Sequence, residues 1–275
     1  MNKENKIPEP VITQKNNCKF LLFSSFSDTK LAVSVYSTRT GGISPAPFNT
    51  MNLGTTTNDK IENIIENRKI FSKATGVTFK NTLKQIHGTK VIILNNIRKN
   101  NGSVVYEKKC PIGDALITNI KKNPLVIMVA DCYVIYFLDP LNKAIGIAHA
   151  GWRGTAENIS GEVLKQMNKE YGTLSENCII GISPGIGRCC FEVDEDVFKE
   201  FKKAGFDLPE FLEKKDNKWH IDLLKINLYL LKKNKVKEEN ISYSTLCTSC
   251  NKELFYSYRR EKGNTGRMAG AIMLS

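Results

Sequence analysis

The feature that most constrains the fold is an apolar stretch at residues 125–138 (LVIMVADCYVIYFL), which only Asp131-Cys132 interrupts. Apolar and polar residues do not alternate here, so the stretch cannot be a surface strand with one face in water. It is also shorter than the roughly 18 apolar residues of a membrane-spanning helix. We therefore expect two buried strands, or one strand bent at the polar pair.

Predicted helices and further strands alternate along the rest of the chain. Asp59 and Thr155 are candidate caps for the first two helices. The predicted strands are residues 31–37, 90–94, 115–118, 144–149, 177–182, 242–246 and 255–258, and the predicted helices are residues 58–75, 155–171, 194–204 and 223–233. We therefore expect a mixed α/β (α+β) fold, with a disordered leader at residues 1–19 and a single catalytic domain at residues 20–275. Since no GxGxxG follows a strand, no dinucleotide is expected.

The chain is basic, with a formal net charge of +12. Its lysines are scattered among asparagines, and no nucleic-acid-binding motif is present. We therefore expect no specific nucleic-acid partner, only a mild attraction for anions such as phosphate. The polar N-terminus is not a secretory signal, and no apolar run is long enough to cross a membrane. A cytoplasmic protein without a membrane partner is predicted.

The eight cysteines do not form a dense disulfide framework in a chain of this length, so free thiols are expected. Cys189 and Cys190 are adjacent and cannot readily bridge each other. Cys247 and Cys250 form a single CxxC, and no second CxxC exists to complete a tetrahedral zinc site. A structural role is the favoured interpretation, and whether Cys250 has any further role stays open.

Histidine is scarce, and two of the three histidines lie in chemically suggestive surroundings. Two imidazoles, from His87 and His149, and the thiolate of Cys132 would suit a zinc ion that keeps one position open for water or substrate. These residues are far apart in sequence, so a folded scaffold must bring them together. Taken singly, a His before Gly is typical of a turn, and a Cys in an apolar run is typical of buried packing.

Several short stretches resemble the laccase-domain (YfiH-like) family, in order from about residue 36 to 273. The resembling stretches are TRTGG (38–42), NLG (52–54), QIHG (85–88), GDALIT (113–118), ADC (130–132), HAGWRG (149–154), FYSYRR (255–260) and TGRMA (265–269). The resemblance implies sheets layered between helices in a sandwich. It also implies a zinc-dependent purine nucleoside phosphorylase that acts on adenosine, inosine and S-methyl-5′-thioadenosine and also deaminates adenosine. The family's metal ligands correspond to His87, Cys132 and His149.

Other residues of these stretches are candidates for supporting roles. Arg39, Arg153 and the start of a helix near Thr155 are candidate phosphate-binding groups, because phosphorolysis needs cationic and N–H donors. Asp114 and Asp131 could transfer protons or accept hydrogen bonds from the ligand imidazoles, and the second role is favoured. Arg259, Arg260 and Arg267 are expected to brace the domain, and His220 to be structural.

Three other functions can be compared with the sequence. A multicopper oxidase is excluded, because a blue-copper centre alone takes two His and one Cys and would leave only His220 for any further copper ions. Copper could still substitute for zinc at a single site. A metal-free hydrolase with Cys132 as nucleophile and His149 or His87 as base, acting on an amide or a peptidoglycan-precursor peptide, uses the same residues. A nucleic-acid-binding or interaction protein would not depend on Cys132. The oligomeric state does not follow from the sequence.

Overall fold

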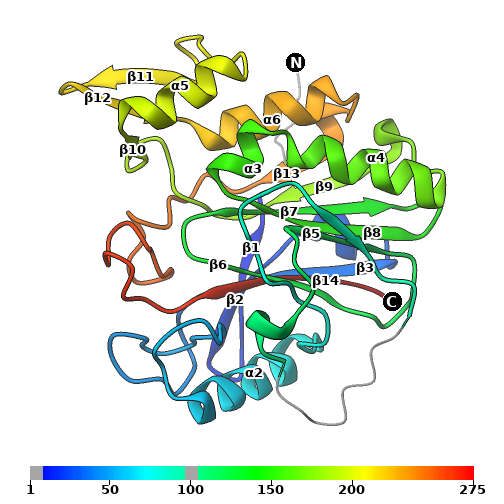
Figure 1. Ribbon diagram of the computed structural model, residues 1–275. Coiled ribbons are helices and arrows are strands. Elements are labelled where there is room, and N and C mark those ends of the chain that lie inside the picture. The colour runs from blue at the N-terminus through cyan, green and yellow to red at the C-terminus, as the bar shows by residue number, and fades with distance from the viewer. Residues whose placement is uncertain (1–8, 97–104) are drawn as a thin grey trace, which may run out of the picture.

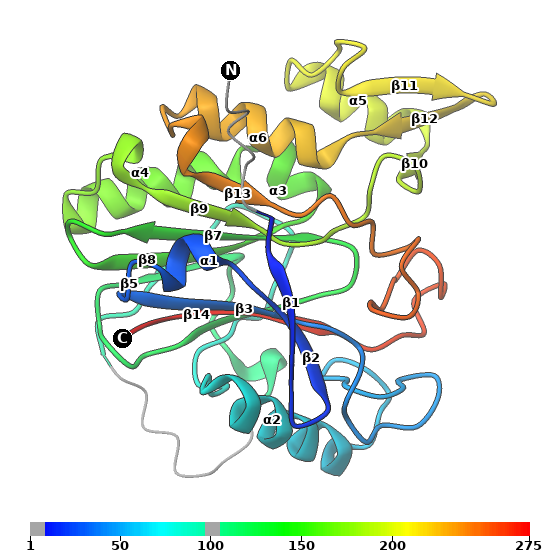
Figure 2. The same cartoon turned by 180° about the vertical axis from the view of Figure 1, so that it is seen from behind.

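The computed structural model describes residues 9–96 and 105–275, and its elements form stacked layers (Figures 1 and 2). The strands are β1 (Val11–Lys15), β2 (Cys18–Leu22), β3 (Ala32–Ser37), β4 (Val91–Ile93), β5 (Ala115–Thr118), β6 (Leu125–Val129), β7 (Tyr133–Asp139), β8 (Ala144–Ala150), β9 (Ile179–Ile182), β10 (Glu192–Val193), β11 (Leu212–Lys215), β12 (Lys218–Ile221), β13 (Ile241–Tyr243) and β14 (Met268–Leu274). The α-helices are α1 (Ser24–Ser27), α2 (Ile61–Thr75), α3 (Trp152–Ala156), α4 (Ile159–Tyr171), α5 (Glu195–Lys203) and α6 (Leu223–Lys233).

Within the described ranges the strands form three sheets. A five-stranded sheet has the order β1-β2-β3-β14-β6, and a six-stranded sheet has the order β13-β9-β7-β8-β5-β4. A small sheet, β10-β12-β11, lies beside α5. Helix α2 covers the outer face of the five-stranded sheet, and α3, α4 and α6 cover the outer face of the six-stranded sheet (Figure 1). The predicted layered sandwich of mixed sheets flanked by helices is confirmed.

Strand β7 shows how the apolar residues fill the layers. Tyr133, Ile135 and Phe137 belong to the core between the six-stranded sheet and its helices. Val134, Tyr136 and Leu138 alternate with them and belong to the core between the two large sheets. Both faces of the strand are therefore buried, as a near-continuous apolar sequence requires.

The apolar stretch at residues 125–138 joins the two large sheets. Its first half is β6 in the five-stranded sheet, and its second half is β7 in the six-stranded sheet. Asp131 lies at the crossing with φ +83°, in the left-handed region that few non-glycine residues adopt. The prediction of two buried strands with the polar pair at the break is confirmed, and Asp131-Cys132 consequently lies at one end of the sandwich.

Two predicted helix starts are wrong. Asp59 does not cap α2: its carboxylate accepts hydrogen bonds from Ser44, Asn52 and Asn63 side chains, and the helix begins after Lys60. Thr155 lies inside α3, and α4 begins after Asn158, whose side chain accepts from the Gly161 amide. The predicted helix at residues 155–171 is thus two helices, because Asn158 adopts a left-handed conformation between them.

Two other predictions are corrected. Residues 255–258 are not a strand; their backbone is irregular, and the Ser257 hydroxyl and the backbone amide of the following Arg259 both donate to the Asp131 carboxylate. The predicted leader is wrong for residues 11–19, which form β1 and enter β2 of the five-stranded sheet, where Cys18 is fully buried in the core beneath α2. Residues 1–8 lie outside the described ranges. A single domain at residues 20–275 stays a prediction.

None of the helices in residues 9–96 and 105–275 combines the length and apolar character needed to cross a membrane.

Candidate metal centre

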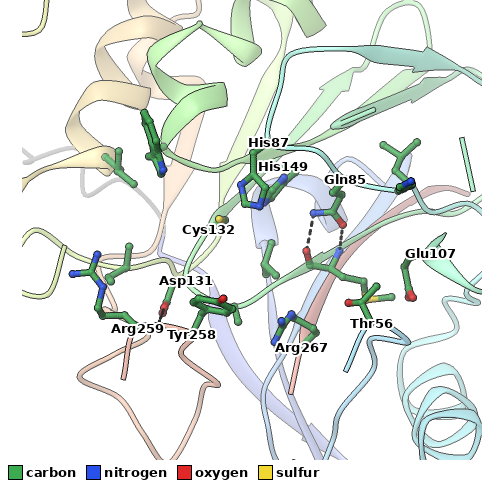
Figure 3. Close-up of a pocket in the computed structure, with 18 of the residues that line it drawn as sticks. Thr56, Gln85, His87, Glu107, Asp131, Cys132, His149, Tyr258, Arg259 and Arg267 are labelled. Atoms are coloured by element: carbon green, nitrogen blue, oxygen red, sulfur yellow. Dashed lines mark hydrogen bonds between the residues drawn. The ribbon is translucent and has the colours of Figure 1, made fainter. Parts of the chain in front are cut away.

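His87, Cys132 and His149 converge at the end of the sandwich where the chain crosses between the sheets (Figure 3). His149 is on β8, paired with Val134 of β7, and Cys132 immediately precedes β7. His87 comes from the loop before β4, where its φ is +61°. One ligand atom from each residue lies within 4.8 Å of the other two, and the two imidazole centroids are 4.7 Å apart. Three distant segments thus form one centre.

Asp114 holds the two histidines in place. Its buried carboxylate lies 2.9 Å from Nδ1 of His149 and accepts hydrogen bonds from the backbone amides of Ile86, His87 and Gly88. A carboxylate that accepts the Nδ1 proton leaves Nε2 of His149 as the free ligand atom. The favoured role of Asp114, as an acceptor from a ligand imidazole, matches this contact.

Gly151 leaves the space that the three ligands occupy. A Cβ atom at this position would lie 2.8 Å from His87 Nδ1 and 3.2 Å from Cys132 Sγ. Any side chain would therefore displace the imidazole or the thiol. The first glycine of the HAGWRG motif is required by this close approach rather than by its backbone angles.

The three side chains also perturb one another electrostatically. Burial raises the pKa of Cys132, but the neighbouring His149 and His87 outweigh it and lower the pKa to about 6. Burial lowers the pKa of His149, yet the Cys132 thiolate and the Asp114 carboxylate raise it to about 9. Without a metal, the pair therefore favours a thiolate beside an imidazolium.

A cavity of about 550 Å³ opens over this centre. Its volume lies in the range of roughly 300–1,000 Å³ that is usual for small-molecule sites. Apolar lining comes from residues such as Ile186, Phe191 and Leu223, and the cationic residues on its walls are Lys84, Lys108, Arg259 and Arg267. Figure 3 shows Tyr258 and Arg267 across the cavity from the two imidazoles.

Asp131 lines the same cavity but faces another part of the chain. Its carboxylate accepts hydrogen bonds from the hydroxyls of Thr248 and Ser257 and from the backbone amide of Arg259. It therefore joins the sheet crossing to the loop that carries Arg259. Its contacts are not with a ligand imidazole, and a catalytic role for Asp131 stays a prediction.

The predicted phosphate-binding arginines do not lie at the metal centre. Arg39 pairs with Glu261, stacks over Tyr256 and lines a separate cavity. Arg153 stacks over Trp152 and lines another hollow with acidic residues of α5.

Arg259 and Arg267, expected only to brace the domain, line the central cavity instead. They do brace as well: Arg259 donates to the carbonyls of Cys190 and Glu192, and Arg267 donates to those of Thr265 and Gly266. Their position within the FYSYRR and TGRMA stretches was the sequence feature that could have indicated a place at the cavity. His220 lies on β12, where Nδ1 contacts the carbonyl of Arg188, outside the centre.

Together, the layered sandwich and a His₂Cys cluster from three distant segments define a class of mixed α/β proteins with a candidate metal site at one end of the sheets. The family described as "Multi-copper polyphenol oxidoreductase laccase" matches residues 33–275, and the chain belongs to this family. The family description does not make the chain a multicopper enzyme, since beyond this centre the sequence holds only His220 as a further imidazole ligand.

Related proteins of this family are named purine nucleoside phosphorylases rather than laccases. The chain is 30% identical over 249 residues to "Purine nucleoside phosphorylase YlmD" of Bacillus subtilis, covering 89% of each chain. It is 34% identical over 244 residues to "Purine nucleoside phosphorylase" of Deinococcus radiodurans, covering 87% of this chain and 88% of the relative.

Solved structures share the fold. The Bacillus licheniformis hypothetical protein YfiH superimposes with a TM-score of 0.86 at 29% identity, over 96% of this chain and 99% of that chain. YlmD from Geobacillus stearothermophilus gives a TM-score of 0.86 at 28% identity over the same shares.

Proposed function

We propose that the chain is a zinc-dependent purine nucleoside phosphorylase that acts on adenosine, inosine and S-methyl-5′-thioadenosine and also deaminates adenosine. The observation that carries the proposal is the convergence of His87, Cys132 and His149 on the wall of one cavity. The substrate class comes from the names of the relatives. The localisation we propose is cytoplasmic, with purine nucleosides and phosphate as small-molecule partners.

The three side chains suit zinc. Tetrahedral zinc with nitrogen and sulfur ligands brings its ligand atoms to about 3.5 Å from one another, and here they lie within 4.8 Å. A set of three protein ligands is typical of catalytic rather than structural zinc. Bound zinc would supply a Lewis acid and a water molecule with a pKa near 7. Copper is a possible substitute because divalent affinity peaks at copper.

The remaining cavity residues would contact two different parts of the substrates, the purine ring and the phosphate. The apolar side chains of Ile186, Phe191 and Leu223 offer a surface to the flat purine. Arg259 and Arg267 are better placed than Arg39 or Arg153 to hold a phosphate, because they line the cavity that contains the centre. Asp114 keeps His149 in one orientation during turnover.

The two reactions make different demands on these groups. In phosphorolysis the C1′–N9 bond breaks, a phosphate oxygen bonds to C1′, and the departing N9 takes the electron pair and then a proton. In deamination water oxygen replaces the amino group at C6, and ammonia leaves. The zinc deaminase signature HxE followed by PCxxC is absent from the sequence, so deamination would use a different set of residues.

The test is to incubate purified protein with adenosine, with and without phosphate, and to follow adenine, hypoxanthine and ribose 1-phosphate. The proposal expects adenine and ribose 1-phosphate only with phosphate, inosine from deamination in either condition, and hypoxanthine only where phosphate then cleaves that inosine. Cys132→Ala should abolish both activities with the fold retained. Absence of any purine product in both conditions would refute the proposal.

A second candidate is a cysteine hydrolase acting on an amide, such as a peptidoglycan-precursor peptide. The lowered pKa of Cys132, about 6 beside His149, favours it, because a thiolate–imidazolium pair is a suitable nucleophile. Zinc at one equivalent per His₂Cys centre in active protein would argue against it. Amide hydrolysis by metal-free protein, lost on alkylation of Cys132, would establish it.

A further inference from the structure

A second group of sulfur atoms lies apart from the His₂Cys centre. Cys189 and Cys190 meet Cys247 and Cys250, and one sulfur from each lies within 4.8 Å of the other three. Sγ of Cys250 is 3.6 Å from that of Cys189 and 3.5 Å from that of Cys190. The sequence contains no second CxxC, but the fold brings the adjacent pair Cys189-Cys190 to the CxxC, so two further thiols are available there.

Two turns present these thiols to one another. A parallel bridge pairs Gly185 with Cys247, and the Thr248 amide donates to the Gly185 carbonyl. One turn closes when the Cys190 amide donates to the Gly187 carbonyl, and the other when the Asn251 amide donates to the Cys247 carbonyl. Backbone hydrogen bonds thus place the four thiols without requiring any sulfur–sulfur bond.

Gly187 resembles the glycine of the first centre in its close contact with sulfur. A Cβ atom there would lie 3.3 Å from Cys189 Sγ and 3.5 Å from Cys247 Sγ. The Gly187 amide donates to Cys247 Sγ at 3.2 Å. Hydrogen bonds from backbone amides to sulfur stabilise thiolates, the form in which cysteine binds metals.

Arginines lie next to both turns. Arg260 donates to the carbonyls of Thr248 and Ser249, and Arg259 donates to the carbonyl of Cys190. A zinc ion with four thiolates carries a net charge of about −2, which nearby guanidinium groups offset.

We propose that Cys189, Cys190, Cys247 and Cys250 bind one structural zinc ion, distinct from the His₂Cys centre. Four thiolates around one point are typical of tetrahedral zinc. Zn–S bonds of about 2.3 Å put tetrahedral sulfurs about 3.8 Å apart. The two printed sulfur distances, 3.6 and 3.5 Å, are close to that value and far from a disulfide bond. The site is closed by protein ligands and has no open position for substrate.

The proposed site would rigidify one wall of the cavity. Thr248, between the CxxC cysteines, donates to Asp131, and the Ile186 amide donates to the Asp131 carbonyl. Ile186 and Phe191, on either side of the Cys189-Cys190 turn, line the cavity. The inference does not rest on the proposed function, because it concerns metal binding by other residues.

The test measures zinc per chain in full-length protein purified under reducing conditions, for wild type, Cys132→Ala, Cys250→Ser and the double variant. Cys110→Ser is the matched control, since it changes a partly exposed cysteine that belongs to neither cluster. We expect two zinc ions in wild type and in Cys110→Ser, one in each of the other single variants and none in the double variant. Cobalt substitution should give a thiolate charge-transfer band that survives in Cys132→Ala and is much weaker in Cys250→Ser.

A readout on the wild type guards against misfolding of the variants. Alkylation followed by peptide mass spectrometry should modify the four cysteines only after metal removal. Any of three results would overturn the proposal: equal zinc content in Cys250→Ser and wild type, iron in place of zinc, or a disulfide among the four cysteines in reduced, metal-replete protein. Loss of zinc from Cys132→Ala alone would bear on the first centre and not on this one.

Discussion

At the scale of single residues, the metal centre depends on side chains that do not themselves bind metal. The Asp114 carboxylate accepts hydrogen bonds from one imidazole and three backbone amides, and so fixes both the orientation of His149 and the loop of His87. Gly151 contributes by having no side chain. The ligands could be proposed from the sequence because histidine is scarce and the motifs are specific. The contacts of Gly151 could not be predicted from the sequence, because they depend on three-dimensional packing.

Asp114→Asn should weaken zinc binding by about 10- to 100-fold, the usual cost of losing a carboxylate that supports a metal-bound histidine. Competition with a chromophoric chelator measures the change. Asp139→Asn is the matched control, because Asp139 is equally buried but accepts hydrogen bonds in the turn after β7. Equal zinc affinity in the two variants would contradict the role given to Asp114.

Gly151→Ala should abolish zinc binding at the His₂Cys centre while the fold is retained, since its Cβ would approach His87 Nδ1 to 2.8 Å. Gly88→Ala is the control: its Cβ would meet only ordinary contacts, the nearest at 3.7 Å from Asp114. Zinc content and far-ultraviolet circular dichroism decide the matter. A Gly151→Ala variant with full zinc occupancy would show that the space beside Gly151 is not needed for zinc binding.

At the scale of elements, sequence patterns predicted many of the buried elements, although the buried strands β2 and β14 were missed. Helix α6 and strand β5 have the predicted bounds, because their apolar residues face a core. Strand β1 was missed because nearly all its side chains are exposed, so its polar sequence carries no burial pattern. Residues 255–258 were predicted to be a strand, and Phe255 and Tyr256 are indeed buried, but the hydrogen bond from Ser257 to Asp131 is part of an irregular path.

Asp131→Ala should lower the free energy of unfolding by about 3 kcal/mol, because two buried hydroxyls and an amide lose a charged acceptor. Urea denaturation followed by fluorescence measures this loss. Asp194→Ala should change stability little, since its pair with Lys218 is exposed and screened by solvent. Matching midpoints for the two variants would mean that Asp131 does not fasten the sheet crossing to the loop.

At the scale of the whole molecule, the two large sheets form one scaffold that brings distant loops to one end. The crossing from β6 to β7 puts Cys132 at that end, and the pairing of β8 with β7 puts His149 beside it. The layered architecture followed from the family resemblance, whereas the cavity and its arginines followed only from the arrangement of loops. Arg39 and Arg153 lie in glycine-containing motifs, but they line other cavities. A residue's position in a motif does not determine where its side chain points.

Tyr136 links the two large sheets, because its buried hydroxyl donates to the carbonyl of Val35 on β3 at 2.9 Å. Tyr136→Phe should therefore cost about 1 kcal/mol of stability and leave zinc content unchanged. Thermal and urea unfolding, with metal analysis of the same samples, test both parts. A stability equal to wild type would show that this hydrogen bond does not help to hold the sheets together.

The central claim is that His87, Cys132 and His149 hold one zinc ion at the base of the cavity. Anomalous diffraction from crystals of the full chain, recorded on both sides of the zinc absorption edge, tests it most directly. The account predicts an anomalous peak within bonding distance of all three side chains, present only above the edge. Zinc-replete crystals with no such peak between these residues would contradict it.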